Sequence, residues 1–517
     1  MRRAKPERRL IRPACVVTCL LGALGAQAQD DGRAASPLGL GLKVEATASA
    51  TETITDNLRL STSDRRAEAI TMLTAGLRIA GRLGGIQGSL DYSLSGFVYA
   101  RGSESARHQQ RLSLSSAGSV ELVDNWAYLD VSAGISQQAI SAFGLQSSAD
   151  GLVNPNRTEV RQYLLSPYVR GRLGSFATYQ ARISHSVSSS SGTSLGDAST
   201  DTASISLASG SPGAVVGWTA GASRTVTDSR AGRPTDTSQV TAGTVVRPHP
   251  EIQFTGSVGR EFSDVVTADS RSTAYWSLGV DMRPSERTRL SAQRSHRYFG
   301  NAYQLNFSHR LQRSMWSLTS SRDVSQPGGA LSAANTTAFD LLFAQLAAIE
   351  PDPIRRAELA TAALRDRGID PGAQVSVGFL SATATVATRH QLSASLQGVR
   401  DTVTATLFSS DSRRADGQFV TAGDDLSSAD RVRQRGYSVT VGHRLTPVSS
   451  LSLSASVNRA SGSAASQSNR LSSVLLVYSA RLGVKSNGSL SLRRAQFSSP
   501  ANPYSENAAI ATFSLRF

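Results

Sequence analysis

Apolar and polar residues alternate along most of this chain, so that every second side chain in many segments is apolar. After Pro37 one phase reads Leu40, Leu42, Val44, Ala46, Ala48 and Ala50, and the other reads Gly41, Lys43, Glu45, Thr47, Ser49 and Thr51. The alternation returns in 86–98, 271–283 and 437–445. A period of two residues is that of an extended strand, whose successive side chains point to opposite faces. The sequence therefore predicts long strands with one apolar and one polar face.

The composition narrows the choice among all-β architectures. Only 39% of the 517 residues are hydrophobic and 18% are charged. Several alternating segments are longer than the roughly five or six residues that are usual for globular strands. A sandwich would bury the apolar faces between two sheets, whereas a transmembrane barrel turns them outward to lipid around a polar lumen.

The connections between the alternating segments favour the barrel. The short turns are Gly84-Gly85, Asp124-Asn125, Gly174-Ser175, Pro248-His249-Pro250, Pro284-Ser285-Glu286 and Thr446-Pro447, and the long polar connections are 56–68, 138–157, 190–200, 326–374 and 412–430. Short turns at one end and long loops at the other are typical of outer-membrane barrels, and no segment of the sequence is apolar enough to be a spanning helix. The final alternating strand carries Phe513, Leu515 and Phe517 on one face, which we expect the barrel-assembly machinery to recognise.

Counting the alternating segments predicts an antiparallel barrel of about 22 strands, within a range of 20 to 24. The predicted strands are 38–55, 69–83, 86–101, 109–122, 126–137, 158–173, 176–189, 201–210, 214–227, 237–247, 251–263, 271–283, 288–299, 302–312, 314–325, 391–400, 402–411, 431–445, 450–459, 467–481, 487–497 and 506–517. Segment 375–388 alternates weakly and could be a further strand or part of a loop. With an even number of strands, the last strand ends at the same end of the barrel at which the first strand begins.

The first 28 residues have the pattern of a secretory signal peptide. A basic stretch up to Arg12 is followed by the short apolar run 14–23 and by the small-residue cleavage site Ala26-Gln27-Ala28. Both cysteines, Cys15 and Cys19, lie inside this segment. The mature chain is then a single barrel domain over 29–517 without a thiol, located in the outer membrane of a Gram-negative cell.

One connection departs from the period of two. Within 326–374, apolar residues recur at spacings of three and four in 337–349 and in 353–367, and Pro353 is well placed to begin the second helix. We expect a helical hairpin in an external loop. It either caps the rim of the barrel or forms a constriction or docking element.

The sequence shows little sign of catalytic or metal chemistry. None of the seven histidines lies at a metal-binding spacing such as His-Glu-x-x-His, so we predict no metal and no cofactor. Ser308-His309 resembles a nucleophile and base only superficially, because serine is abundant throughout. We therefore predict that the protein is not an enzyme, and an outer-membrane hydrolase is a distant alternative.

The basic charge is more informative, because nearly all of it is arginine. The formal net charge is +15, and only Lys5, Lys43 and Lys485 are lysines. Seven arginines on the polar phase are predicted to face the lumen: Arg78, Arg82, Arg101, Arg111, Arg283, Arg310 and Arg444. Such a lumen would attract an anionic solute. The alternative is that arginines near strand ends meet lipid head groups or lipopolysaccharide. Nucleic acid is a poor fit, because no basic cluster with a stacking platform is present.

Several segments together resemble a known family. They are 55–58 (TDNL), 90–94 (LDYSL), 126–131 (WAYLDV), 135–138 (ISQQ), 166–170 (SPYVR), 276–279 (WSLG), 297–303 (RYFGNAY), 308–310 (SHR) and 315–318 (MWSL). The chain resembles the outer-membrane proteins associated with the PEP-CTERM and exosortase system, which are often encoded beside exopolysaccharide genes. The resemblance spans most of the mature chain and implies an outer-membrane barrel, but no catalytic residue.

These observations lead to one functional expectation and one alternative. We expect a porin-like barrel that passes or guides anionic or neutral exopolysaccharide, with outer-membrane lipid, lipopolysaccharide and the assembly machinery as its other partners. The alternative is a structural or adhesion barrel whose external loops bind surface polymer without transport. A barrel of this strand number is wide enough that only a plug or infolded loops would close it.

Overall fold

The computed structural model describes residues 41–101, 108–149, 151–210, 214–327, 342–343, 356–357, 360, 378–416 and 423–517. The predicted signal peptide lies outside the described residues. The strands are β1 (Leu42–Thr55), β2 (Glu68–Leu83), β3 (Ile86–Tyr99), β4 (His108–Val123), β5 (Ala127–Ala139), β6 (Arg157–Leu173), β7 (Ala177–Ser190), β8 (Ala198–Ser209), β9 (Val216–Ser229), β10 (Thr235–His249), β11 (Ile252–Ser263), β12 (Arg271–Ser285), β13 (Thr288–Arg297), β14 (Gly300–Arg310), β15 (Ser314–Ser325), β16 (Thr385–Gln397), β17 (Asp401–Arg414), β18 (Arg431–Thr446), β19 (Ser449–Ser461), β20 (Ser468–Arg481), β21 (Ser486–Ser498) and β22 (Tyr504–Arg516).

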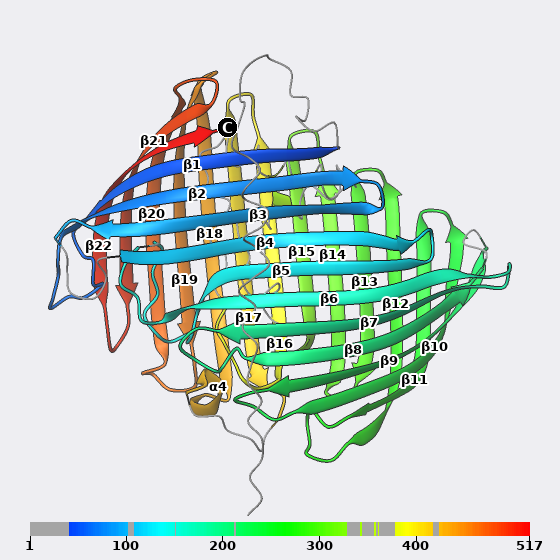
Figure 1. The fold of residues 1–517 in the computed structure, drawn as a ribbon. Helices are drawn as coiled ribbons and strands as arrows, with labels where there is room; N and C mark the ends of the chain where they lie inside the picture. Colours follow the sequence, from blue (N-terminus) through cyan, green and yellow to red (C-terminus); the bar gives the residue numbers. More distant parts are fainter. Residues whose placement is uncertain are drawn as a thin grey trace, which may run out of the picture. The chain divides into compact units, whose positions relative to one another are not determined.

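These 22 strands form one closed antiparallel barrel (Figure 1). Each strand pairs with its neighbours in sequence, and the last strand pairs with the first from Thr47–Arg516 to Thr55–Ala508. Closure leaves no unpaired sheet edge, which is the condition for a sheet to stand in hydrocarbon. The predicted fold class and strand number are confirmed.

The connections differ in length at the two ends of the barrel, as predicted. Residues 84–85, 250–251 and 447–448 are tight turns at one end, here called the short-turn end. At the other end, the long-loop end, the connections include 140–156 and 415–430. Because the strand number is even, β1 begins and β22 ends at the short-turn end.

Strand bounds agree with the predicted ones to within a few residues, except at β16. This strand was predicted to begin at residue 391 but begins at Thr385. The segment 375–388, for which the sequence allowed either a strand or part of a loop, therefore contributes its last residues to β16. Ahead of that strand, Phe379 forms an isolated bridge with Ala139 of β5.

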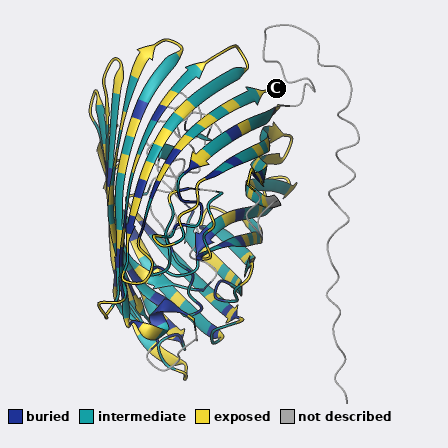
Figure 2. Ribbon diagram, turned by 90° about the vertical axis from the view of Figure 1, so that its left-hand side faces the viewer, coloured by how far each residue is buried: buried dark blue, intermediate teal, exposed yellow. Residues whose placement is uncertain are grey.

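The outer face of the barrel is apolar and the inner face is polar. Leu73, Val258 and Leu278 are 57%, 64% and 63% exposed, and exposed residues alternate with less exposed ones along the strands (Figure 2). On the opposite face, hydroxyl groups of neighbouring strands hydrogen bond to one another. These pairs include Thr51–Thr512, Thr74–Ser95, Ser166–Ser184, Thr202–Thr225, Ser257–Ser277, Thr440–Ser454 and Ser450–Ser479. An apolar outer face around a polar inner face is typical of outer-membrane barrels.

Helix is scarce among the described residues. The helix α4 (Asp425–Ser428) lies in the loop between β17 and β18. Of the predicted hairpin in 326–374, the structure describes 342–343, 356–357 and 360, which are helical, and the remainder lies outside the described residues. The guanidinium of Arg356 lies 4.9 Å from the ring centroid of Phe343. No helix in the described part of the chain is long and apolar enough to cross a bilayer.

Candidate functional site: the lumen and its long-loop mouth

Strand register places six of the seven predicted arginines on the inner face. They are Arg78, Arg82, Arg111, Arg283, Arg310 and Arg444, each on the phase opposite to the exposed apolar side chains of its strand. For example, Arg111 lies opposite Ser95, whose hydroxyl hydrogen bonds to Thr74 on the inner wall. The lumen therefore carries fixed positive groups on strands around its circumference.

Two of these arginines are held by carboxylates on the same wall. Arg78 donates from Nε to Asp91 of β3 over 2.9 Å. Arg283 lies 3.4 Å from the carboxylate of Asp281, which also lies 3.6 Å from Arg289. Ion pairing fixes the direction of these side chains and reduces their net positive field.

Arg101 lies elsewhere, two residues beyond the end of β3 in the long-loop connection. Its backbone N–H donates to the buried carboxylate of Glu68 over 2.8 Å, and its guanidinium donates to the carbonyl of Ala67. It ties the loop to β2 and does not stand on the wall of the lumen.

A column of stacked arginine and tyrosine side chains stands on the inner wall of β5, β6 and β7. The Arg170 guanidinium lies 4.3 Å from the ring centroid of Tyr128, which stacks on Tyr168 with a centroid distance of 5.0 Å. Arg182 lies 4.0 Å from the ring centroid of Tyr168 on the far side. Stacked guanidinium and phenol groups are held rigidly, so they form a prepared surface for a ligand.

Hydrogen bonds fix both ends of this Arg–Tyr column. Arg170 donates to the Tyr128 hydroxyl over 3.0 Å, and Arg182 donates to Asp130 and to Ser166, both over 2.8 Å. Arg170 is exposed to the lumen and Arg182 is partly exposed. The column can offer cations to an acid group and aromatic faces to a sugar ring.

The sequence prediction missed Arg170 and Arg182, although both lie on the polar phase of their strands. One feature of the sequence could have indicated this site. Tyr128 and Tyr168 both lie on the polar phase of their strands, where large aromatic side chains are not expected. Only the strand register shows that the two tyrosines lie directly opposite each other.

At the long-loop end, the connecting loops fold over the lumen and pack against the inner wall. Leu58 packs with the inner-face residues Ile70, Phe97 and Tyr99. Leu60 packs with Phe497 and its inner-face neighbours, of which Tyr504 also donates to the carbonyl of Gln146 over 2.6 Å. Figure 2 shows loop segments, some of them buried, between the walls of the barrel. Infolded loops therefore narrow the mouth.

Two adjacent carboxylates at the helix α4 bind two neighbouring loops, 140–156 and 378–384. Asp424 accepts hydrogen bonds from the Ser381 hydroxyl and the Ala382 N–H, both over 2.9 Å. Asp425 accepts from the Ser141 hydroxyl and the Ala142 N–H, both over 2.6 Å. We call this arrangement the Asp424–Asp425 latch. It fastens the loops 140–156 and 378–384 to α4 and to each other.

The latch should be sensitive to pH. The pKa of Asp425 is raised to about 6, chiefly by burial and also by the charge of Asp424, against the hydrogen bonds from Ser141 and Ala142, which lower it. Because this pKa lies above the ordinary value of 3.8, the contribution of Asp425 to latching is fully present below pH 4 and is lost as the pH rises to 6. The change amounts to roughly 1–3 kcal/mol.

We expect the closed fraction of single-channel recordings to rise when the pH is lowered from 7 to 5. Asp425→Asn keeps an acceptor for the Ala142 N–H and a donor toward Ser141, so this variant should stay latched at both pH values. If the closed fraction of Asp425→Asn still depends on pH as it does in the wild type, a group other than Asp425 causes the pH dependence.

Ser308 and His309 do not form a catalytic pair. They are consecutive residues of β14 and so point to opposite faces of the sheet. The His309 ring nitrogen lies 2.8 Å from the Thr288 hydroxyl, on the face that carries Leu290 and Phe307.

No protein-family model and no curated protein sequence matches this chain. Among solved structures, similar folds include the ferric enterobactin receptor PfeA of Pseudomonas aeruginosa, at 10% identity over 92% of this chain and 80% of that chain, with a TM-score of 0.46. The FrpB iron transporter of Neisseria meningitidis is 10% identical over 92% and 83% of the two chains, with a TM-score of 0.48. The outer membrane protein OpdK of Pseudomonas aeruginosa is 10% identical over 92% and 99%, with a TM-score of 0.36. At such identities the likeness concerns the fold alone.

Proposed function

We propose that this chain is a porin-like barrel of the outer membrane that conducts or guides acidic polysaccharide. Outer-membrane location is supported by the closed sheet, the apolar outer face and the polar lumen. The observation that carries the choice of solute is the Arg–Tyr column, since it places cations and aromatic faces side by side on the wall of the lumen.

The hydroxyl pairs of the inner wall support a polysaccharide in particular. Serine and threonine hydroxyls both donate and accept, as the hydroxyls of a sugar do. A chain of sugars can therefore exchange its hydrogen bonds with water for bonds to the wall. The resemblance to barrels of the PEP-CTERM and exosortase system agrees with this solute, and membership of that system is part of the proposal. Recognition of Phe513, Leu515 and Phe517 during barrel assembly is likewise proposed.

The infolded mouth favours a second candidate function. Loops that pack against the inner wall at several apolar clusters would restrict a polymer at that end. In the second candidate the barrel is a support, and its loops bind surface polymer without passing it.

Single-channel conductance of residues 29–517 in a planar bilayer separates these functions. We expect steps of conductance that alginate, an acidic polysaccharide, blocks at concentrations where neutral dextran of equal length blocks less. A barrel that resists denaturation by detergent until heated, yet shows no conductance at any pH, would overturn the conduit and favour the loop-binding function.

A further inference from the structure

Three arginines form a row on the outer face of the barrel. Arg435 of β18 lies directly opposite Arg459 of β19, which lies directly opposite Arg470 of β20. All three are exposed and lie on the phase of Tyr437 and Val474, whose apolar side chains face outward. Like charges that lie directly opposite on neighbouring strands repel each other. The row is therefore a destabilising arrangement unless an anion covers it.

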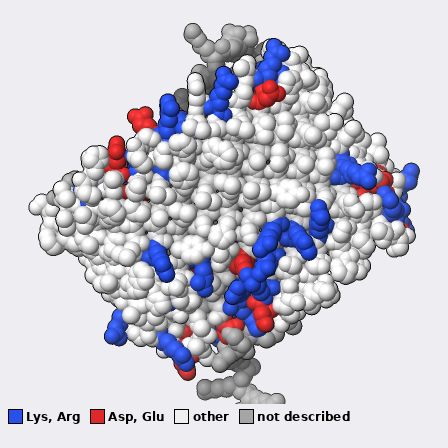
Figure 3. Space-filling model, turned by 180° about the vertical axis from the view of Figure 1, so that it is seen from behind, with Lys and Arg blue, Asp and Glu red and all other residues white. Residues whose placement is uncertain are grey.

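The nearby acid does not neutralise this row. Asp411 of β17 is occupied by Arg431, which donates to it, and lies 3.6 Å from Arg413 and 3.9 Å from Arg433. Within the described residues, no carboxylate forms an ion pair with Arg435, Arg459 or Arg470. Figure 3 shows basic side chains at several places on an outer face that is otherwise mostly uncharged, and the largest group forms a band with a few acidic side chains beside it. This band has an excess of positive charge.

One other outward arginine has an acid partner within the chain. Arg224 of β9 also faces outward, but it lies 2.6 Å from Asp236 of β10. The row on β18–β20 has no such partner among the described residues, so an anion from outside the chain can complement it.

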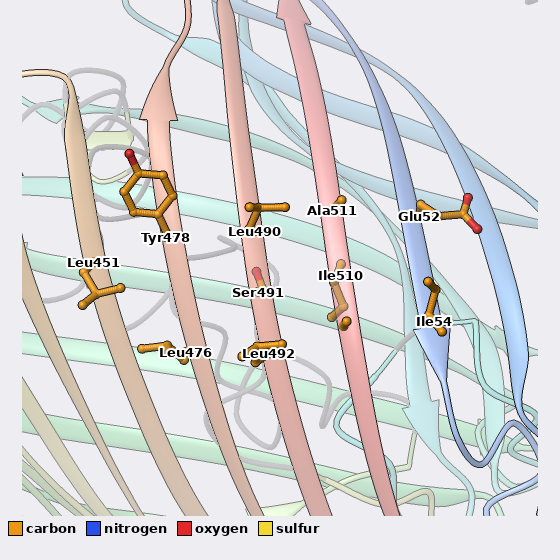
Figure 4. A pocket seen from close by; sticks show the side chains of 11 residues that line it. Glu52, Ile54, Leu451, Leu476, Tyr478, Leu490, Ser491, Leu492, Ile510 and Ala511 are labelled. Atoms are coloured by element: carbon orange, nitrogen blue, oxygen red, sulfur yellow. The ribbon is translucent and has the colours of Figure 1, made fainter.

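The row lies on the long-loop side of an apolar groove that is open on the outer wall. The groove has a volume of 410 Å³ and runs across β19–β22 and β1, the place where the barrel closes. Its lining includes the larger apolar residues Leu451, Leu476, Tyr478, Leu490, Leu492 and Ile54 and the small residues Ala509 and Ala511. Figure 4 shows most of these side chains on neighbouring strands. Its lining is almost wholly apolar.

One carboxylate lies at the margin of the groove and is turned away from it. Glu52 accepts a hydrogen bond from the Thr71 hydroxyl of β2 over 2.6 Å, and its carboxylate points away from the leucines of the groove (Figure 4). The apolar surface is thus left continuous from Ile54 to Leu451.

The distances along the strands join the row to the groove. On β20, Arg470 and Leu476 lie on the same face six residues apart, which is about 20 Å at the rise of a strand. On β21, Arg494 is exposed on the outer face only two residues beyond Leu492. Because strands of such barrels are tilted by about 35–45°, about 20 Å along a strand is a depth of about 15 Å, which is about half of the hydrocarbon core of a bilayer. The groove therefore lies within reach of an acyl chain whose head group contacts the arginines.

We propose that the row and the groove form a binding site for lipid A, the phosphorylated glycolipid anchor of lipopolysaccharide in the outer leaflet. Arg435, Arg459 and Arg470 bind its phosphates, and the groove receives one acyl chain. Arginine forks match phosphate oxygens, and phosphate charge removes the repulsion within the row. The orientation follows from the proposed outer-membrane location, in which the long-loop end faces outward.

The site is tested by native mass spectrometry of the intact barrel in detergent with added bis-phosphorylated lipid A. The variant Arg435→Gln/Arg459→Gln/Arg470→Gln should bind roughly tenfold less of it or lose it altogether. Arg224→Gln, the matched outward control, should bind as the wild type does. Ala509→Trp fills the groove without changing charge and should also weaken binding.

Dephosphorylated lipid A and phosphatidylglycerol are the comparison ligands. We expect both to bind wild-type barrel more weakly than bis-phosphorylated lipid A, and the triple variant to discriminate less among the three. Equal binding by wild type and triple variant, or preference for phosphatidylglycerol, would overturn the proposal. Conductance is recorded on the same preparations. Loss of lipid A with conductance unchanged supports the site whatever the solute is, and absent conductance with lipid A retained contradicts only the conduit.

Discussion

Replacing both latch carboxylates, as Asp424→Ala/Asp425→Ala, is expected to raise the conductance of the channel at least about twofold, because loops and not strands set the width of a barrel this large. The double variant removes the four hydrogen bonds that hold the loops 140–156 and 378–384 to α4. It also removes the helix cap that Asp424 provides to the Leu426 N–H over 3.0 Å. The released loops can then leave the lumen.

The control is Asp430→Ala, which removes one carboxylate from the same loop. Asp430 is 92% exposed and lies 3.4 Å from Arg414, without contact to the other loops. Its conductance should equal that of the wild type at pH 7. If the double variant conducts no better than Asp430→Ala, the narrowing of the lumen must lie elsewhere than at the latch.

The second large effect is expected at the Arg–Tyr column. Arg170→Gln/Arg182→Gln removes two cations that face the lumen and leaves the tyrosine pair in place. We expect the apparent dissociation constant for block by alginate to rise roughly tenfold or more, since each charge-assisted contact contributes about 1.5–3 kcal/mol before its partial screening by water.

Two controls separate this effect from general damage. Block by neutral dextran should change little, because it does not depend on these cations. Arg224→Gln, on the outer face, should leave block by alginate unchanged. An unaltered alginate block in the double variant would remove the column from the path of the polymer.

The strands could be predicted because their signal is local. Most outward residues of the strands are apolar, so apolar identity repeats every second position and marks both the strand and its face. The prediction was weakest at the start of β16, where the outward residues Val386, Thr388 and His390 include only one that is strongly apolar. At these positions the alternation of apolar and polar residues is weak, but backbone pairing with β15 and β17 still extends the strand through them.

The mouth could not be predicted from the period of two, because its packing joins segments far apart in sequence. Ser141 and Asp425 are 284 residues apart, and nothing local to either indicates their hydrogen bond. One clue was available: Leu58, Leu195 and Leu426 lie in polar loops, where an apolar side chain needs a partner. The Arg–Tyr column depends in the same way on the register of three strands.

The pairing of the first strand with the last has a consequence for how this protein is made. Thr47 pairs in register with Arg516, so this pairing joins strands that are far apart in the sequence. Contacts of such long sequence separation form late and slowly, since the entropy of closing the loop must be lost before they form. Until the last residues have been synthesised, two strand edges stay available to other chains. A partly formed sheet therefore exposes edges that can pair with other chains until β1 and β22 meet.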